Sequence, residues 1–274
     1  MLKRVNRRKK TLILIFASLS ILLFIMAGGA FIPESGYDAD FSSKNQSPSL
    51  EHPFGTDFMG RDMFFRTWKG LTVSLVVGLS AAMISSVIAA ALGILAAMWK
   101  KADAAISWLI DLFLSVPHIV LLILISIALG KGVTGVVAGV ALTHWPALAR
   151  IIRVEVLSIR NAPFIEYAGK LGMGKWRIAY KHMIPHLFPQ FITGTLLIFP
   201  HAILHEASIT FLGFGLSPEQ PAIGIILSES LKYITGGLWW LAFFPGLMLV
   251  CIILLFDALG EQLSALMNPR KSRE

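Results

Sequence analysis

The feature that most constrains the fold of this chain is a series of long segments that contain no Asp, Glu, Lys or Arg. An α-helix rises about 1.5 Å per residue, so roughly 20 uncharged residues cross the hydrocarbon core of a bilayer. Backbone groups in lipid must be satisfied within the spanning structure, and these segments lack the alternation of a barrel strand. The sequence therefore predicts an all-α membrane protein with six transmembrane helices, within residues 11–33, 71–99, 112–130, 132–149, 187–205 and 233–256.

The basic residues that flank these segments predict their orientation. Lys and Arg in short loops stay on the cytoplasmic side of a membrane. With the amino terminus inside, most of the 24 Lys and Arg residues fall in four cytoplasmic segments, 1–10, 100–103, 150–186 and 264–274. We therefore expect both termini to be cytoplasmic, and we attribute the formal net charge of +8 mainly to topology rather than to nucleic-acid binding. A cleaved signal peptide is the less favoured interpretation of the first segment, since its apolar stretch is long and five more segments follow.

The hydrophilic segment 34–69 is predicted to face outward. Four large side chains near its end, Phe58, Met63, Phe64 and Trp68, are compatible with a short amphipathic helix on the outer interface. They are equally compatible with an ordinary linker that has aromatic anchors. The segment is short for a separate catalytic domain.

The longest of the predicted cytoplasmic segments has the pattern of two short helices. Phe164, Ala168 and Leu171 share one side of the first helix, which Gly172 ends. Residues 176–185 carry apolar side chains at helical spacing and lead into the fifth spanning segment. Two short helices joined at a glycine predict a protruding knob. The alternative is a pair of interfacial helices that lie on the inner leaflet.

Motifs for enzymatic chemistry fail when they are tested residue by residue. Residues 169–175 match the first seven positions of a nucleotide-binding loop, but Trp176 follows where a Ser or Thr must ligate magnesium. A zinc-protease helix needs a second histidine four positions after His205, and none is there. The single cysteine, Cys251, lies within the last spanning segment, which excludes a disulfide framework or a thiolate cluster. We therefore expect no enzyme activity and no cofactor bound by this chain.

Histidines in the fourth and fifth spanning segments are the candidate ligands. His201 and His205 are four residues apart, so both rings lie on one helical face, and Glu206 lies about 100° further round. An acid near a helix centre costs about 2.5 to 3.5 kcal/mol on insertion scales, so we expect Glu206 to face protein or water. His144 is a third imidazole that could turn inward.

Imidazole is a good ligand for nickel, copper and zinc. His201 and His205 are therefore a candidate transient metal site, and together with His144 and Glu206 they are a candidate substrate path. The alternative is that these histidines only form hydrogen bonds that pack the helices together. Tight binding would in any case oppose transport, because a cargo must also leave.

The predicted knob carries a family motif. Glu166-Tyr167-Ala168, then Gly172 four residues beyond Ala168, and the later Pro185 resemble the cytoplasmic signature of ABC importer permeases, with Tyr167 where Ala is usual. Over residues 52–268 the chain resembles the second permease subunit of the dipeptide, oligopeptide and nickel group. The residues that carry this wider resemblance are Gly55, Asp57, Gly60, Asp62, Asp111, Pro117, Ala149, Arg150, Arg153, Glu206, Ser208, Phe211, Gly213, Pro245 and Gly246.

The resemblance implies a type I ABC importer permease, in the bacterial cell membrane, with a cytoplasmic coupling helix. It implies four partners in addition to lipid: a sister permease, two ATPase subunits that hold ATP and magnesium, and an extracellular solute-binding protein. The expected organisation is an N-terminal region 1–70, a permease core 71–268 with its coupling loop at 150–186, and a tail 269–274. The residues that the resemblance places against the ATPase are Glu166, Tyr167, Ala168, Lys170, Leu171, Gly172 and Pro185.

The histidines also bear on the cargo. Histidines at positions like His144, His201 and His205 look more similar to those of nickel and metal-chelate permeases, so the favoured cargo is nickel or a metallophore complex. The alternative cargo is a dipeptide or oligopeptide carried by the same kind of machine. A membrane enzyme that uses His205 and Glu206, and a passive channel, are more distant alternatives.

Overall fold

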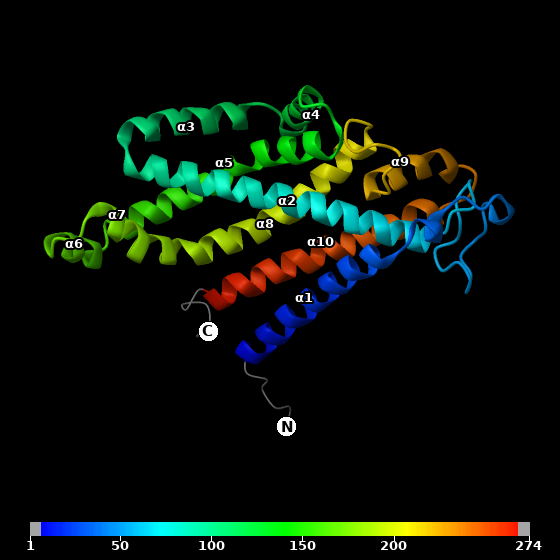
Figure 1. Cartoon of the computed structure of the whole chain (residues 1–274), viewed down its shortest axis with the longest axis horizontal. Coiled ribbons are helices and arrows are strands. Elements are labelled where there is room, and N and C mark those ends of the chain that lie inside the picture. The colour runs from blue at the N-terminus through cyan, green and yellow to red at the C-terminus, as the bar shows by residue number, and fades with distance from the viewer. Residues whose placement is uncertain (1–6, 268–274) are drawn as a thin grey trace.

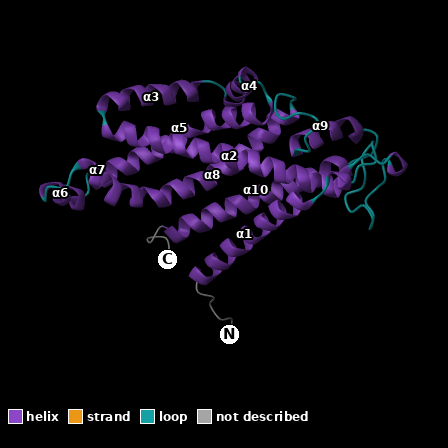
Figure 2. Ribbon diagram, viewed as in Figure 1, coloured by secondary structure: helices purple, strands orange, loops and turns teal. Residues whose placement is uncertain are grey.

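The computed structural model describes residues 7–267, and within this range the chain is built from helices. Five long helices cross most of the molecule (Figures 1 and 2). Five shorter helices lie beside the long ones or at the ends of the bundle. The long helices are α1 (Arg7–Phe31), α2 (Met63–Met98), α5 (Gly132–Arg160), α8 (Ile184–Phe211) and α10 (Trp240–Met267). The short helices are α3 (Lys100–Ser115), α4 (His118–Ala128), α6 (Pro163–Lys170), α7 (Lys175–Ile178) and α9 (Ile223–Ile234).

Each of the five long helices has the length and apolar character to cross a membrane, which confirms five of the predicted spans. The span predicted within residues 112–130 is not one straight helix. It is broken after Ser115, where α3 and α4 meet at a bend of 100°. Proline disfavours helical backbone in the residue before it, and Val116 is accordingly extended, with ψ 138°, before Pro117. The sixth candidate span is therefore a bent pair of helices.

Helix α2 lies at the centre of the bundle and packs against α1, α3, α5, α8 and α9. Small residues let its neighbours approach closely, as is usual between helices in membranes. At Gly93, an added Cβ would lie 2.8 Å from the carbonyl oxygen of Ala149 on α5. Large apolar side chains such as Phe24, Val87 and Leu254 are more than half exposed on the outer faces, which suits contact with lipid.

The predicted amphipathic helix in the segment before α2 does not form. Phe58 lies in a loop and stacks on Tyr233, with ring centroids 4.7 Å apart. Helix α2 begins directly at Met63, because the carboxylate of Asp62 accepts hydrogen bonds from the backbone N–H groups of Phe64 and Phe65 and so caps it. The aromatic residues therefore pack on other helices of this chain instead of lying on the membrane surface.

A network of ion pairs fastens this segment to α9. The carboxylate of Asp57 accepts from Arg61 at 2.6 Å and from Arg66 at 3.1 Å. The same two guanidinium groups reach Glu229 of α9, at 3.0 Å from Arg61 and 2.6 Å from Arg66. Asp57 and Arg66 are buried. Gly60, with φ +77°, sits beside this network, and any Cβ there would overlap the carbonyl group of Asp40.

The start of α1 and the end of α10 point away from the segment before α2 and toward the side where α6 and α7 lie (Figure 1). This arrangement agrees with two termini on the same side of a membrane. That the side is the cytoplasmic one stays a prediction from the basic residues.

Candidate functional site

The predicted knob is present at one end of the molecule, where α6 and α7 project beyond the long helices (Figure 1). Helix α6 begins with Pro163, which suits a first helical position, and it ends before Gly172, whose φ of +81° reverses the chain. From α7 the backbone runs through a π-helical segment, Ala179–Met183, directly into α8. A movement of the knob would therefore be transmitted to a long membrane helix.

One side of α6 packs against the rest of the chain. Ile165 and Ala168 are buried against the rest of the chain, whereas Leu171 is 86% exposed. Phe164 is partly exposed, and its ring stacks on that of His186, with centroids 5.6 Å apart. Of the three side chains expected to share one side of this helix, only that of Ala168 is buried, and Leu171 follows the last residue of α6, directly before the reversal at Gly172.

The exposed surface of the knob mixes large apolar and charged side chains; Arg177 and Lys181 are exposed as well. Tyr167 is 64% exposed and Tyr180 77% exposed, in addition to Leu171. The ammonium group of Lys170 lies 2.6 Å from the carboxylate of Glu166 four residues earlier, and both side chains are exposed. An exposed apolar surface at the tip of a projecting element is typical of a contact with another protein.

The last of the predicted coupling residues, Pro185, lies elsewhere. It is in the first turn of α8, where it lines a cavity of about 620 Å³ with Glu155 of α5 and Met267 of α10. Its rigid φ suits a first turn, so its place in the structure is explained by the start of α8.

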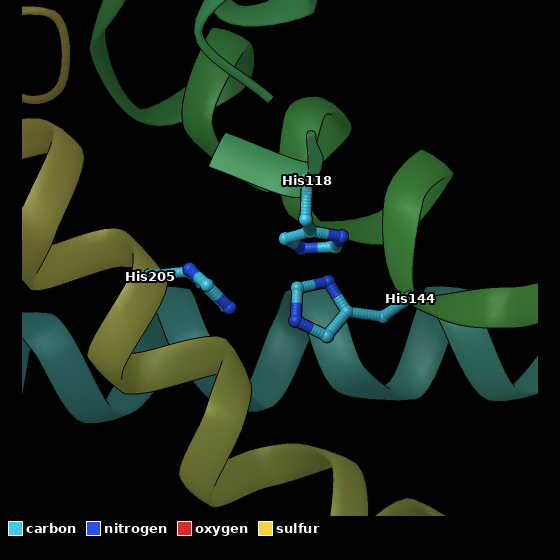
Figure 3. A group of neighbouring side chains, drawn as sticks. All are labelled: His118, His144 and His205. Carbon is cyan, nitrogen blue, oxygen red and sulfur yellow. The ribbon is translucent and has the colours of Figure 1, made fainter. Parts of the chain in front are cut away.

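Three partly buried histidines converge from three helices (Figure 3). His118 begins α4, His144 lies in α5 and His205 in α8. One ring nitrogen from each lies within 4.8 Å of those of the other two. His201, which spacing paired with His205, is exposed and does not belong to this group. The structure therefore brings His144 and His205 together as a site, with His118 in place of His201.

The sequence analysis does not single out His118, because it predicts one straight span within residues 112–130. In a straight helix it would have been one polar residue among lipid-facing ones. The signal was Pro117, which marks a break directly before the histidine and turns it toward α5 and α8.

Glu206 is fully buried, which confirms that it faces protein rather than lipid. Its Oε1 atom accepts a hydrogen bond of 3.1 Å from the hydroxyl of Thr210. It does not belong to the group of histidines, although it follows His205 directly. Its part in a substrate path stays a prediction.

The first helix of the bent pair, α3, is held to α5 by two ion pairs. The guanidinium group of Arg153 donates two hydrogen bonds of 2.6 Å to the carboxylate of Asp103. Arg150 donates one of 2.5 Å to Asp111, and this second pair is exposed. These contacts fix α3 against α5 and so position the break that carries His118.

Comparison with known proteins gives a consistent result. A family model described as binding-protein-dependent transport system inner membrane component matches residues 89–272. The dipeptide transport system permease protein of Bacillus subtilis is 32% identical over 272 residues, which cover 97% of this chain and 85% of that protein. A putative peptide transport system permease protein of Brucella abortus is 33% identical over 229 residues, which cover 84% of this chain and 77% of that protein.

Among solved structures, a chain of the inward-facing MetNI methionine ABC transporter has the same fold. The TM-score is 0.61 at 18% identity, and the match covers 75% of this chain and 98% of the other. At this level of identity the likeness concerns the fold alone.

Proposed function

The chain belongs to the family of binding-protein-dependent transport system inner membrane components, and on this premise we propose that it is the permease through which an ATP-driven importer takes up short peptides. The family is one of ABC importer permeases in the inner membrane. The chain is therefore a multi-pass transport subunit and not a membrane enzyme, and ATP hydrolysis belongs to separate subunits.

The proposed cargo is a short peptide, which the sequence analysis gives as the alternative, and not the nickel or metallophore complex that it favours. The observation that carries it is the similarity to a dipeptide permease over 97% of this chain. The relatives named above are described for dipeptides or peptides, and none of them for nickel. Only three histidine positions favour nickel, whereas the similarity to the dipeptide permease extends over 97% of the chain. We therefore place peptides ahead of free nickel as the main cargo.

In this proposal the knob binds an ATPase subunit through the exposed side formed by Tyr167, Leu171 and Tyr180. A second ATPase, a sister permease and a solute-binding protein complete the machine. Closure of the ATPases would move α6 and α7 as a unit, since Gly172 sets a compact turn between them. Because α8 continues from α7, the movement reaches His205 in the interior and rocks the helices between two states.

Cells that lack the gene are expected to lose uptake of a radiolabelled dipeptide by at least about tenfold, because no other part of the importer supplies this half of the pathway. Growth of an auxotroph on a dipeptide that contains the required amino acid measures the same loss. A plasmid copy should restore both, and growth on the free amino acid should not change. Undiminished dipeptide uptake in the deletion strain, with no competing peptide importer present, would contradict the proposed cargo.

A further inference from the structure

The convergence of His118, His144 and His205 has a geometry that simple packing does not require. Ring centroids lie 4.5 Å apart between His118 and His144, 4.5 Å between His118 and His205, and 5.2 Å between His144 and His205. The ring planes are inclined to one another by 46° to 90°, and in Figure 3 a face of the His118 ring lies toward the His144 ring. Among the residues that the structure describes, no hydrogen bond joins one of these rings directly to another, and the hydroxyl of Thr143 lies 3.4 Å from Nε2 of His118 and 3.2 Å from Nδ1 of His144.

His144 is oriented as a metal ligand would be. Its Nδ1 atom lies 2.9 Å from the carbonyl oxygen of Val140 and donates a hydrogen bond to it. This fixes the proton on Nδ1 and leaves a lone pair on Nε2, the arrangement that backbone carbonyls impose on ligating histidines. Nε2 is buried, and within residues 7–267 it has no hydrogen-bond partner. An unsatisfied buried acceptor is destabilising, and a bound cation would satisfy it.

The distances allow a single ion to bind all three rings. Three ligands at about 2.1 Å from one ion lie about 3.4 to 3.6 Å from one another in tetrahedral or trigonal geometry, whereas the three nitrogens lie within 4.8 Å of one another. Side-chain rotations that bring them together by roughly 1 Å close this difference. Three imidazoles and no thiolate or carboxylate suit nickel, copper or zinc better than calcium or magnesium.

The position of the site in the fold also favours an ion. His118 is the first residue after a bend of 100° inside a candidate span. Membrane proteins use such breaks to place ligands in the interior, where an irregular backbone is tolerated only around a cavity or a site. Packing of lipid-facing helices alone gives no reason for a break that directs an imidazole inward.

The charge of the site indicates the form in which the metal arrives. The group contains three imidazoles and no carboxylate, and the nearby Glu206 is hydrogen-bonded to Thr210 instead. A bare divalent ion would bring uncompensated charge into the membrane interior, which is strongly unfavourable. A metal held by the carboxylate and amide nitrogens of a peptide brings its own negative charge.

We propose that His118, His144 and His205 form an intramembrane site for a divalent transition metal that enters as a complex with a small anionic chelator such as a peptide. As regards cargo, this inference rests on the proposed function, because it makes metal-loaded peptides a class of substrate. Binding of the metal itself does not depend on that function.

The binding test uses the purified importer complex in detergent, titrated by calorimetry with nickel and excess glycylhistidine. X-ray absorption at the nickel edge, with glycylglycine in place of glycylhistidine so that the chelator brings no imidazole, counts the imidazole ligands from the protein. Alanine at His118, at His144 or at His205 is expected to weaken binding by at least about tenfold and to lower the imidazole count. If His144→Ala does not insert because its ring is the most enclosed, the two other variants carry the test.

Two matched controls remove a histidine outside the group. His186→Ala removes an exposed ring near the start of α8, and His201→Ala removes the exposed ring one turn before His205. Both should bind nickel as the parent complex does. No nickel binding by the parent, or an equal loss in His201→Ala and in His205→Ala, would overturn the three-histidine site.

An uptake test separates this inference from the proposed function. Cells with His118→Ala should lose uptake of radioactive nickel glycylhistidine while they keep uptake of metal-free dialanine. Loss of neither substrate would overturn the metal inference and leave the peptide importer intact. Absence of dialanine uptake in the parent cells, with nickel glycylhistidine still taken up through the histidines, would instead overturn peptide import and leave the metal site standing.

Discussion

The double substitution Tyr167→Asp and Leu171→Asp is expected to abolish uptake while the chain still inserts in the membrane. Both side chains are exposed and contact little of their own chain, so the fold tolerates a charge there. A partner surface that buries them would have to desolvate two carboxylates, which weakens such a contact by several kcal/mol. Since about 1.4 kcal/mol is a factor of ten in affinity, we expect at least a hundredfold loss of uptake.

The measurement is dipeptide uptake in cells, together with the amount of ATPase that copurifies with the tagged complex. Leu50→Asp is the matched control, because Leu50 is fully exposed at the opposite end of the molecule. The control should transport normally. Equal uptake by the double variant and the parent would show that the knob does not couple ATP hydrolysis to transport.

The substitution Arg66→Met is expected to lower the free energy of unfolding by about 3 kcal/mol. Arg66 is buried and joins Asp57 to Glu229, so its removal leaves two carboxylates with less compensation in a poorly hydrated place. Thermal unfolding of the complex in detergent measures the loss. Undocking of the segment before α2 from α9 should accompany it, as increased proteolysis between Asp57 and Met63.

The control for this prediction is Arg150→Met. Arg150 also forms an ion pair, with Asp111, but both side chains are more than half exposed. Water screens such pairs, so the expected change is below about 1 kcal/mol. Equal destabilisation by the two substitutions would mean that burial of the network contributes nothing.

The spans were predictable because length and charge alone decide which segments can enter lipid. The knob was predictable for a similar reason, since Gly172 and the spacing from Glu166 to Lys170 act locally. Features that depend on contacts with residues distant in the sequence were not predictable. The inward face of α6 depends on where α5 ends, and the aromatic residues before α2 pack on helices that follow almost two hundred residues later, as Phe54 does on Phe244.

In the candidate site, too, local features were predictable and features that depend on distant neighbours were not. Spacing placed His201 and His205 on one face, which is a local property of any helix. Which ring meets a third histidine depends on how α8 crosses α4 and α5, and on the break at Pro117. The only indication in the sequence that His118 turns inward was its place directly after a proline inside an apolar run. Which side chains it meets follows only from the arrangement of the three helices.

The account depends most on the claim that α6 and α7 receive the movement of a separate ATPase. The direct measurement is cross-linking from Leu171→Cys, in a chain whose single native cysteine is replaced by Cys251→Ser. Leu171 is the better position than Ala168, which is buried. The account predicts a cross-link to an ATPase subunit whose yield changes when ATP binds. Cross-links to lipid alone, with the complex intact, would contradict it.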